Sequence, residues 1–261
     1  MERTVLGRLH FDGTRFAGWQ RQRSERTVQG ELEAVLQRLC GRRVVVYAAG
    51  RTDAGVHAVG MAISATVPER WTPDALRRAI NALLPEDCWL EAVREVRAGF
   101  HARKSATARS YQYRIGTDAA SRSPFRHPFE WSLSRQPDRS LLDQSAALVT
   151  GCHDFRALAV QTGQKRNCQC TVREARWVSR PDAQGYTFHI TADRFLHHLV
   201  RMLVGTMCDI ALERRPVGHL AALLSGQAGV RSSPPAPPQG LYFVAAEYPA
   251  RWFADEPDLA V

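Results

Sequence analysis

The sequence predicts an α+β protein made of two split βαβ, or ferredoxin-like, halves whose sheets are mostly antiparallel. Three observations favour this fold class. Segments with the two-residue period of a strand and segments with a helical period follow one another as β-α-β-β-α-β over roughly the first hundred residues. A similar order recurs in the rest of the chain, and 261 residues are enough for two domains.

Each element of the first half has its own local signal. The apolar alternation of the first strand stops at the turn signal Asp12-Gly13, and Thr27 is a good cap for the helix that follows. Thr72 followed by Pro73 marks the start of a second helix. The predicted elements are a strand at Val5–Phe11, a helix at Thr27–Cys40, strands at Val44–Ala48 and Met61–Val67, a helix at Thr72–Leu84 and a strand at Trp89–Val96.

The second half repeats this alternation of strands and helices. The prolines of Arg231–Gly240 exclude a helix or a central strand, so we expect an extended surface loop there. We predict an N-terminal domain of residues 1–104 and a C-terminal domain of residues 105–261. The predicted elements are a strand at Thr107–Gly116, a helix at Asp138–Val149, paired strands at Cys170–Ser179 and Gly185–Ala192, helices at Phe195–Leu212 and Pro216–Leu224, and a strand at Leu241–Tyr248.

The composition indicates a basic protein without a membrane segment. Lysine and arginine outnumber aspartate and glutamate by 35 to 26, which gives a net charge of +9 and a pI near 9.7. Most of the basic residues are arginine, so a polyanion is the expected partner, with simple solubility as the alternative. No apolar run is long enough to span a bilayer, no secretory leader is visible, and six scattered cysteines fit a reducing compartment. We therefore expect a cytoplasmic protein.

The run AAGRTDAGVHAVG, at Ala48–Gly60, places one carboxylate and one guanidinium between two predicted strands. Loops held by rigid strands often carry catalytic groups. Asp53 is therefore a candidate catalytic carboxylate, and its ordinary alternative is to form a turn or cap a helix. Arg51 could pair with Asp53 or contact a phosphate.

The predicted helix at Phe195–Leu212 is apolar around most of its circumference, so we expect it to be buried. Arg201 on such a helix needs a carboxylate or a ligand, because an unpaired buried charge is very costly. The charge of Arg201 would also be satisfied by pairing with Asp209 or Glu213, or if the polar side of the helix faces water. The polar strip consists of His197, His198, Arg201, Gly205 and Asp209.

Two further features bear on chemistry. Tyr111 shares a strand face with Tyr113, where cross-strand packing is the ordinary role and stacking on an unpaired base is the alternative. Cys168 and Cys170 lack the spacing of zinc ligands, and no phosphate-binding glycine motif is present. We therefore expect no metal and no cofactor.

Five segments together resemble the tRNA pseudouridine synthase A family, and they occur in order over nearly the whole chain. This resemblance implies an enzyme that isomerises uridine to pseudouridine at positions 38, 39 and 40 of the tRNA anticodon stem-loop. It implies no cofactor, a homodimer, and an active-site cleft between the two halves. The segments are FDGTRFAGWQRQ (Phe11–Gln22), GRTDAGVHA (Gly50–Ala58), FHARKSATARSYQY (Phe100–Tyr113), DRFLHHLVRMLVG (Asp193–Gly205) and GLYFVAAEYP (Gly240–Pro249).

The resemblance also implies roles for individual residues. Asp53 is the catalytic aspartate, acting as a nucleophile or a base, and Arg201 forms an ion pair with it. Tyr111 packs against the target uracil, Arg51 helps to hold the flipped-out nucleotide, and Leu241 lines the pocket. Two other functions remain open from the residues alone. One is an RNA-binding module in which Asp53 only closes a turn, and the other is a hydrolase that releases the free base.

Overall fold

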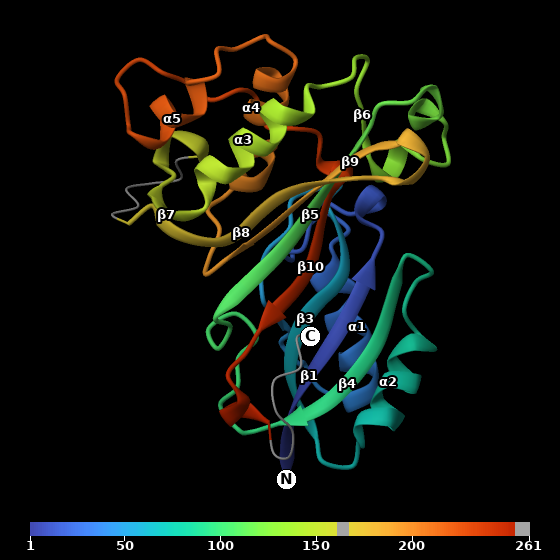
Figure 1. Ribbon diagram of the computed structural model, residues 1–261. Coiled ribbons are helices and arrows are strands. Elements are labelled where there is room, and N and C mark those ends of the chain that lie inside the picture. The colour runs from blue at the N-terminus through green and yellow to red at the C-terminus, as the bar shows by residue number, and fades with distance from the viewer. Residues whose placement is uncertain (161–166, 254–261) are drawn as a thin grey trace. The chain divides into compact units, whose positions relative to one another are not determined.

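The computed structural model describes residues 1–160 and 167–253, and these form two compact units. Unit 1 comprises Met1–Arg109 and the described residues from Tyr242 onward, and unit 2 comprises Ser110–Leu241. Both units combine a sheet with helices (Figure 1), which confirms the predicted α+β class. Most strand pairs are antiparallel, as expected.

Unit 1 contains a sheet with the strand order β4-β1-β3-β10. β1 pairs antiparallel with both β3 and β4, the short β2 pairs with β3, and β10 runs parallel to the first residues of β3. Helices α1 and α2 pack against one face of this sheet (Figure 1). The elements are β1 (Glu2–Phe11), α1 (Val28–Cys40), β2 (Tyr47–Ala48), β3 (His57–Pro68), α2 (Pro73–Asn81), β4 (Cys88–Val96) and β10 (Leu241–Glu247).

Unit 2 contains strands in the order β5-β9-β8-β7, with β6 beside β5. Helices α3 and α4 pack on each other, and α3 also packs on β8 (Figure 1). The elements are β5 (Ala108–Gly116), β6 (Trp131–Ser132), α3 (Arg139–Val149), β7 (Gly151–Asp154), β8 (Gln169–Ser179), β9 (Gly185–Ala192), α4 (Leu199–Ala211) and α5 (His219–Leu224).

The C-terminal strand β10 belongs to unit 1 although it lies at the far end of the chain. Its residues Tyr242 and Phe243 pair with His57 and Ala58 at the start of β3. The boundary predicted between residues 104 and 105 assigns this strand to the C-terminal domain, because sequence order alone does not reveal such a return. Strand pairing thus joins the last strand to the segment that follows Asp53.

The predicted caps at Thr27 and Thr72 are confirmed, and Asp138 caps a third helix. Thr27, Thr72 and Asp138 each accept a hydrogen bond from the backbone N–H three residues further on, which satisfies one of the free donors of a helix start. Several helix ends differ from the prediction, among them the start of α4, which is described with the site below. The second helix ends at Asn81 rather than at Leu84, and α5 begins at His219 rather than at Pro216.

Three strands of unit 1 also differ from the prediction by three residues or more, one of them being β1, which begins at Glu2 rather than at Val5. The strand predicted at Val44–Ala48 is wrong for its first three residues, because the backbone of Val46 bonds to buried side chains of α1 instead of a strand. Its N–H donates to Glu33, and its carbonyl accepts from Gln29. The strand predicted from Met61 begins four residues earlier, at His57.

Two further observations concern the cysteines and the membrane. All six cysteines, each of which lies in the described part of the chain, are free thiols. Among the described residues, no helix combines the length and the apolar character that crossing a bilayer requires.

Candidate active site

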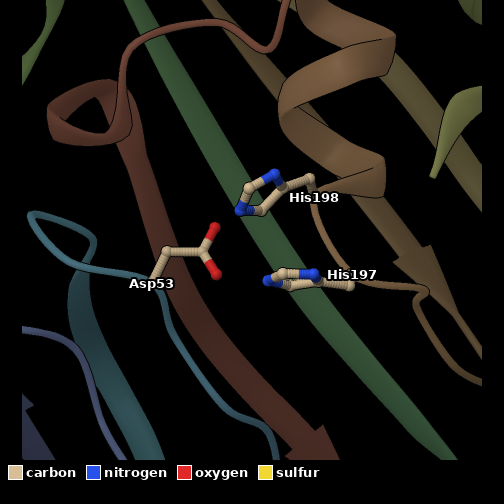
Figure 2. Close-up of side chains that lie close together, drawn as sticks. All are labelled: Asp53, His197 and His198. Carbon is tan, nitrogen blue, oxygen red and sulfur yellow. The ribbon is translucent and has the colours of Figure 1, made fainter. Parts of the chain in front are cut away.

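Asp53 lies on the loop that joins β2 to β3, and its side chain projects from that loop (Figure 2). The loop closes on itself through a hydrogen bond from the Val56 N–H to the Asp53 carbonyl, at 3.2 Å. Asp53 is half-buried, whereas the preceding Thr52 is buried. The turn that the sequence offered as the ordinary role of Asp53 therefore exists, and a backbone hydrogen bond closes it.

The segment Asp12–Trp19 supports this loop through main-chain bonds. The Trp19 N–H donates to the Thr52 carbonyl at 3.0 Å, and the Gly55 N–H donates to the Phe16 carbonyl at 3.3 Å. A Cβ at Gly13 would lie 2.0 Å from the carbonyl oxygen of Val56, so only glycine allows the two backbones to approach this closely. Asp53 is thus presented by two packed backbone segments.

His57, the histidine of the AAGRTDAGVHAVG run, has a structural role in unit 1. It is buried, and its Nδ1 accepts a hydrogen bond from the Gly13 N–H at 3.0 Å. Its ring stacks on Tyr242 of β10, with the ring centroids 4.8 Å apart. The imidazole therefore ties three segments of unit 1 together: the Asp12–Trp19 segment, the start of β3 and the start of β10.

Arg109 connects the chain before Asp53 to a second segment of unit 1. Its Nε donates to the carbonyl of Ala49 at 3.2 Å, and another guanidinium nitrogen donates to the carbonyl of Ala106 at 3.1 Å. A third bond reaches the carbonyl of Arg103. A planar guanidinium with several fixed donors suits such a bridge between backbone segments.

Arg51, the other candidate on the Asp53 loop, is exposed. Among the described residues, its guanidinium forms no ion pair or hydrogen bond. An exposed guanidinium two residues from a half-buried carboxylate is suited to binding a phosphate of a ligand.

In unit 2, Tyr111 lies on β5 and is 8% exposed. The ring of Phe195 meets it edge to face, with the ring centroids 5.0 Å apart. Phe195 precedes α4, so this contact links the strand that carries Tyr111 to the segment that leads to Arg201.

Helix α4 begins at Leu199, not at Phe195 as predicted. The cause is His198, whose φ of +63° is left-handed and interrupts the helical backbone. His197 and His198 therefore lie in the preceding segment, side by side with ring centroids 4.0 Å apart (Figure 2). The apolar pattern of the sequence continues through these residues, which is why it overestimates the helix.

Arg201 is half-buried on α4 and is fixed by the segment Arg231–Gly240. Its Nε donates to the Ala236 carbonyl at 2.8 Å, and the Ala236 N–H donates back to the Arg201 carbonyl at 2.9 Å. We call Arg231–Gly240 the proline strap. Asp209, an alternative partner that the sequence offered for Arg201, lies 3.4 Å from Arg214 and 3.8 Å from Arg215.

The proline strap has no α-helix or strand, as predicted, but it is packed against α4 within unit 2 and is not wholly a surface loop. Ser233 and Ala236 are buried, and the Ser233 N–H donates to the hydroxyl of Thr206 on α4. The Tyr113 hydroxyl donates to the Pro237 carbonyl at 2.7 Å, and burial raises the pKa of Tyr113, which keeps this proton in place. The strap leads directly to Leu241, which is buried at the start of β10.

The sequence-predicted residues are thus distributed over both units. Asp53 and Arg51 share one loop of unit 1, and Tyr111 and Arg201 lie in unit 2 on elements joined through Phe195 and its neighbours. Leu241 is the last residue of unit 2. The ion pair between Asp53 and Arg201 stays a prediction.

A family model described as tRNA pseudouridine synthase matches residues 9–103 and 146–249 of the chain. The chain belongs to the tRNA pseudouridine synthase family. This membership confirms the resemblance found in the five segments. It makes the chain an isomerase of a family that acts on tRNA.

Individual relatives resemble the chain over nearly its whole length. The tRNA pseudouridine synthase A of Chlorobium luteolum is 37% identical over 249 residues, covering 95% of this chain and 96% of that protein. The protein of the same name from Moorella thermoacetica is 38% identical over 243 residues, covering 92% and 97%. A chain in the crystal structure of a Cbf5-Nop10-Gar1 complex is 10% identical, with a TM-score of 0.38, and covers 92% of this chain and 48% of its own length; this likeness is too distant to carry an argument.

Three contacts that support the site in this member of the tRNA pseudouridine synthase family were not predicted from the sequence. They are the Arg109 bridge, the close approach at Gly13 and the pairing of Arg201 with Ala236. The sequence does single out the stretches that contain them. Each support, however, joins residues at least 35 positions apart through a backbone carbonyl, and a carbonyl is present at every position of a chain.

Proposed function

We propose that this chain isomerises uridine to pseudouridine at positions 38, 39 and 40 of the tRNA anticodon stem-loop, with Asp53 as catalytic nucleophile or base. The observation that carries the proposal is the presentation of Asp53. In a member of the tRNA pseudouridine synthase family, a half-buried carboxylate stands on a loop whose backbone is hydrogen-bonded to a second segment on both sides of it. Such a fixed carboxylate suits covalent or general-base chemistry.

The reaction rearranges bonds within one nucleotide. The bond between uracil N1 and ribose C1′ breaks, the base turns, and a bond forms between C5 and C1′. The proton on C5 leaves and N1 gains one, so substrate and product have the same composition and no electron donor or acceptor is consumed. An ionised carboxylate can form a covalent intermediate with the nucleoside or remove a proton, and either role fits Asp53.

The other candidate residues have supporting roles in this proposal. Arg201 pairs with Asp53 and balances the charge of its carboxylate. Tyr111 packs against the target uracil, and Leu241 lines the pocket around it. Arg51 holds the flipped-out nucleotide through a phosphate, in keeping with its exposure.

The substrate and the setting of the reaction follow from the same reasoning. Extruding a uracil from its stack costs a few kcal/mol, which contacts between phosphates and a chain of net charge +9 can offset. We place the reaction in the cytoplasm, where six free cysteines would remain reduced. We also propose a homodimer, on the basis of the family resemblance.

The decisive experiment is incubation with unmodified tRNA transcripts, followed by site-resolved mapping of pseudouridine. We expect pseudouridine at positions 38 to 40 with the unaltered chain and none with Asp53→Ala, while Asp53→Ala still binds tRNA. Asp74→Ala is the matched control, because Asp74 is an exposed carboxylate in the first turn of α2. It should keep full activity.

Two outcomes would contradict the proposal in different ways. Normal turnover by folded Asp53→Ala would remove Asp53 from the chemistry and leave the family assignment intact. A fall in RNA mass with release of uracil would indicate a hydrolase, since isomerisation leaves the mass unchanged.

A further inference from the structure

Unit 1 carries a pair of aromatic rings, Tyr47 and His101, on β2 and on a turn beside it. Tyr47 of β2 is 46% exposed, and its ring lies against that of His101, with the centroids 4.2 Å apart and the planes tilted by 31°. His101 is the first residue of a turn that ends at Ser105, where the Ser105 N–H donates to the His101 carbonyl. We call His101–Ser105 the basic turn, because Arg103 and Lys104 follow His101.

The basic turn is held firmly on the sheet. Ala102 is fully buried, its N–H donates to the hydroxyl of Ser64 on β3 at 2.9 Å, and its carbonyl accepts from Tyr248 at 2.8 Å. Ser64 is the residue that pairs with Tyr47 across the sheet, so the same anchor places His101 beside Tyr47. Tyr47 and His101 are therefore a preformed surface, and binding on it costs little ordering of the chain.

The turn also fixes the state of His101. Its Nδ1 accepts from the backbone N–H groups of Arg103 at 3.1 Å and Lys104 at 3.4 Å, so this nitrogen carries no proton. Partial burial and the positive charges of Lys104 and Arg103 lower the pKa of His101. The imidazole is consequently a neutral flat ring with two cations beside it.

Arg103 and Lys104 are both exposed, and among the described residues neither side chain forms an ion pair. Two cations without carboxylate partners next to an exposed phenol ring combine the two groups that single-stranded nucleic acid requires. These are positive charges for the phosphates and an aromatic face for a base. A protein partner would be expected to need a larger contiguous apolar patch than one half-exposed tyrosine.

We propose that Tyr47, His101, Arg103 and Lys104 form a second RNA contact, in which the two cations bind phosphates and Tyr47 stacks on an unpaired nucleotide of the tRNA outside the target uridine. This inference rests on the proposed function, because it takes tRNA as the substrate. It assigns to the FHARK part of the Phe100–Tyr113 segment a role in holding the substrate, separate from the chemistry at Asp53.

The test measures the affinity of the intact chain for an unmodified tRNA transcript by fluorescence anisotropy at several salt concentrations. We expect Arg103→Gln/Lys104→Gln to raise the Kd roughly tenfold near physiological salt. The slope of log Kd against log salt should fall by about two, one for each lost phosphate contact. Tyr47→Leu should raise the Kd by at least about fivefold, and Tyr47→Phe should stay close to the unaltered chain, because phenylalanine keeps the aromatic face.

The control is Arg38→Gln/Arg78→Gln, which removes the same charge from exposed positions on α1 and α2. It should change neither the Kd nor the slope by more than about a third of the effect of the first pair. Equal effects of the two double variants would overturn the proposal, since net charge alone would then explain binding. An unchanged Kd and slope for folded Arg103→Gln/Lys104→Gln would overturn it as well.

A fallback variant and a binding measurement made without turnover allow the result to be interpreted. If the double variant fails to fold, Lys104→Gln alone provides the same comparison with an expected slope change of about one. Binding is measured without turnover, so a failure of this inference is separate from a failure of the proposed function. The latter would show as an absence of pseudouridine with the unaltered chain.

Discussion

The two segments that present Asp53 and Arg201 are built in different ways. The loop of Asp53 is held by the segment Asp12–Trp19 through backbone bonds and the close approach at Gly13. Arg201 lies on a helix and is held by the proline strap, which is 35 residues away at Ala236. One candidate depends on a tight backbone contact and the other on a long segment that returns to a helix.

This difference determines which substitutions should matter. In unit 1, the space between the backbones at Gly13 and Val56 determines whether a larger residue fits at position 13, and no side chain there can rotate away to make room. In unit 2 the strap contacts α4 through two reciprocal hydrogen bonds and the hydroxyl of Thr206, so a local shift can be partly absorbed. We therefore expect substitutions at the contact between Gly13 and Val56 to be more damaging than substitutions at the contact between the proline strap and α4.

The largest expected effect is that of Gly13→Ala. The new methyl group would lie 2.0 Å from the Val56 carbonyl oxygen, so the Asp12–Trp19 segment or the Asp53 loop must move. We expect a loss of about 3 kcal/mol in the free energy of unfolding, since overpacking against backbone cannot relax through side chains. Pseudouridine formation should fall more than tenfold, because displacement of a reactive group by about 1 Å is already very costly.

Urea denaturation and initial rates with tRNA measure these two effects. Gly218→Ala is the matched control, because a Cβ at Gly218 meets no atom within 4 Å and should change stability by less than about 0.5 kcal/mol. Activity close to normal in folded Gly13→Ala would show that the position of Asp53 does not depend on this contact.

Gly205→Ala tests the support of Arg201 and should have a smaller effect. The methyl group would lie 2.4 Å from the Pro234 carbonyl oxygen and push the proline strap away from α4. Alanine also favours the helix by about 1 kcal/mol, so we expect a net destabilisation of only about 1 to 2 kcal/mol. The rate should fall several-fold, since the displaced strap would strain the bonds between Arg201 and Ala236 in this variant.

The comparison is sharpened by measuring both glycine variants by the same denaturation and rate assays. A rate loss for Gly205→Ala as large as that for Gly13→Ala would show that the strap is not the more tolerant support. If Gly205→Ala changes neither the free energy of unfolding nor the rate of pseudouridine formation, the strap does not fix Arg201.

Much of the fold could be predicted because local signals agree with the final structure. Thr27 and Thr72 are helix caps whose effect depends only on the next few residues, and each caps as expected. The prediction is wrong where residues distant in the sequence determine the local structure. Val46 looks like a strand residue, but its backbone bonds to Glu33 and Gln29 of α1.

The candidate site shows the same limit. The small residues around Asp53 indicate a functional loop, yet nothing in the sequence says that Gly13 must touch Val56. The start of α4 is overestimated because His198 takes a left-handed backbone conformation inside an apolar pattern that favours a helix. Periodicity reports which residues are apolar, whereas a single backbone angle decides where this helix begins.

The smallest expected effect concerns pH and the anchoring of the chain between Asp12 and α1. Arg26 forms two hydrogen bonds with Asp87, at 2.7 and 2.8 Å, and lies over the ring of Phe16. The bond to Arg26 lowers the pKa of Asp87. A lowered pKa in the folded state contributes stability that is complete above the ordinary pKa of about 4 and is lost as the pH falls below it.

The free energy of unfolding should consequently fall more steeply between pH 5 and pH 3 in the unaltered chain than in Arg26→Met, in which the ion pair is absent. The difference in slope between the unaltered chain and Arg26→Met should be modest, because Arg26 is one-third exposed and solvent weakens its attraction to Asp87. Arg38→Met, which removes an exposed guanidinium from α1, should keep the slope of the unaltered chain. Parallel slopes for Arg26→Met and the unaltered chain would mean that the segment beneath Asp53 is held by its backbone contacts alone, which would make Gly13 the main determinant of that half of the site.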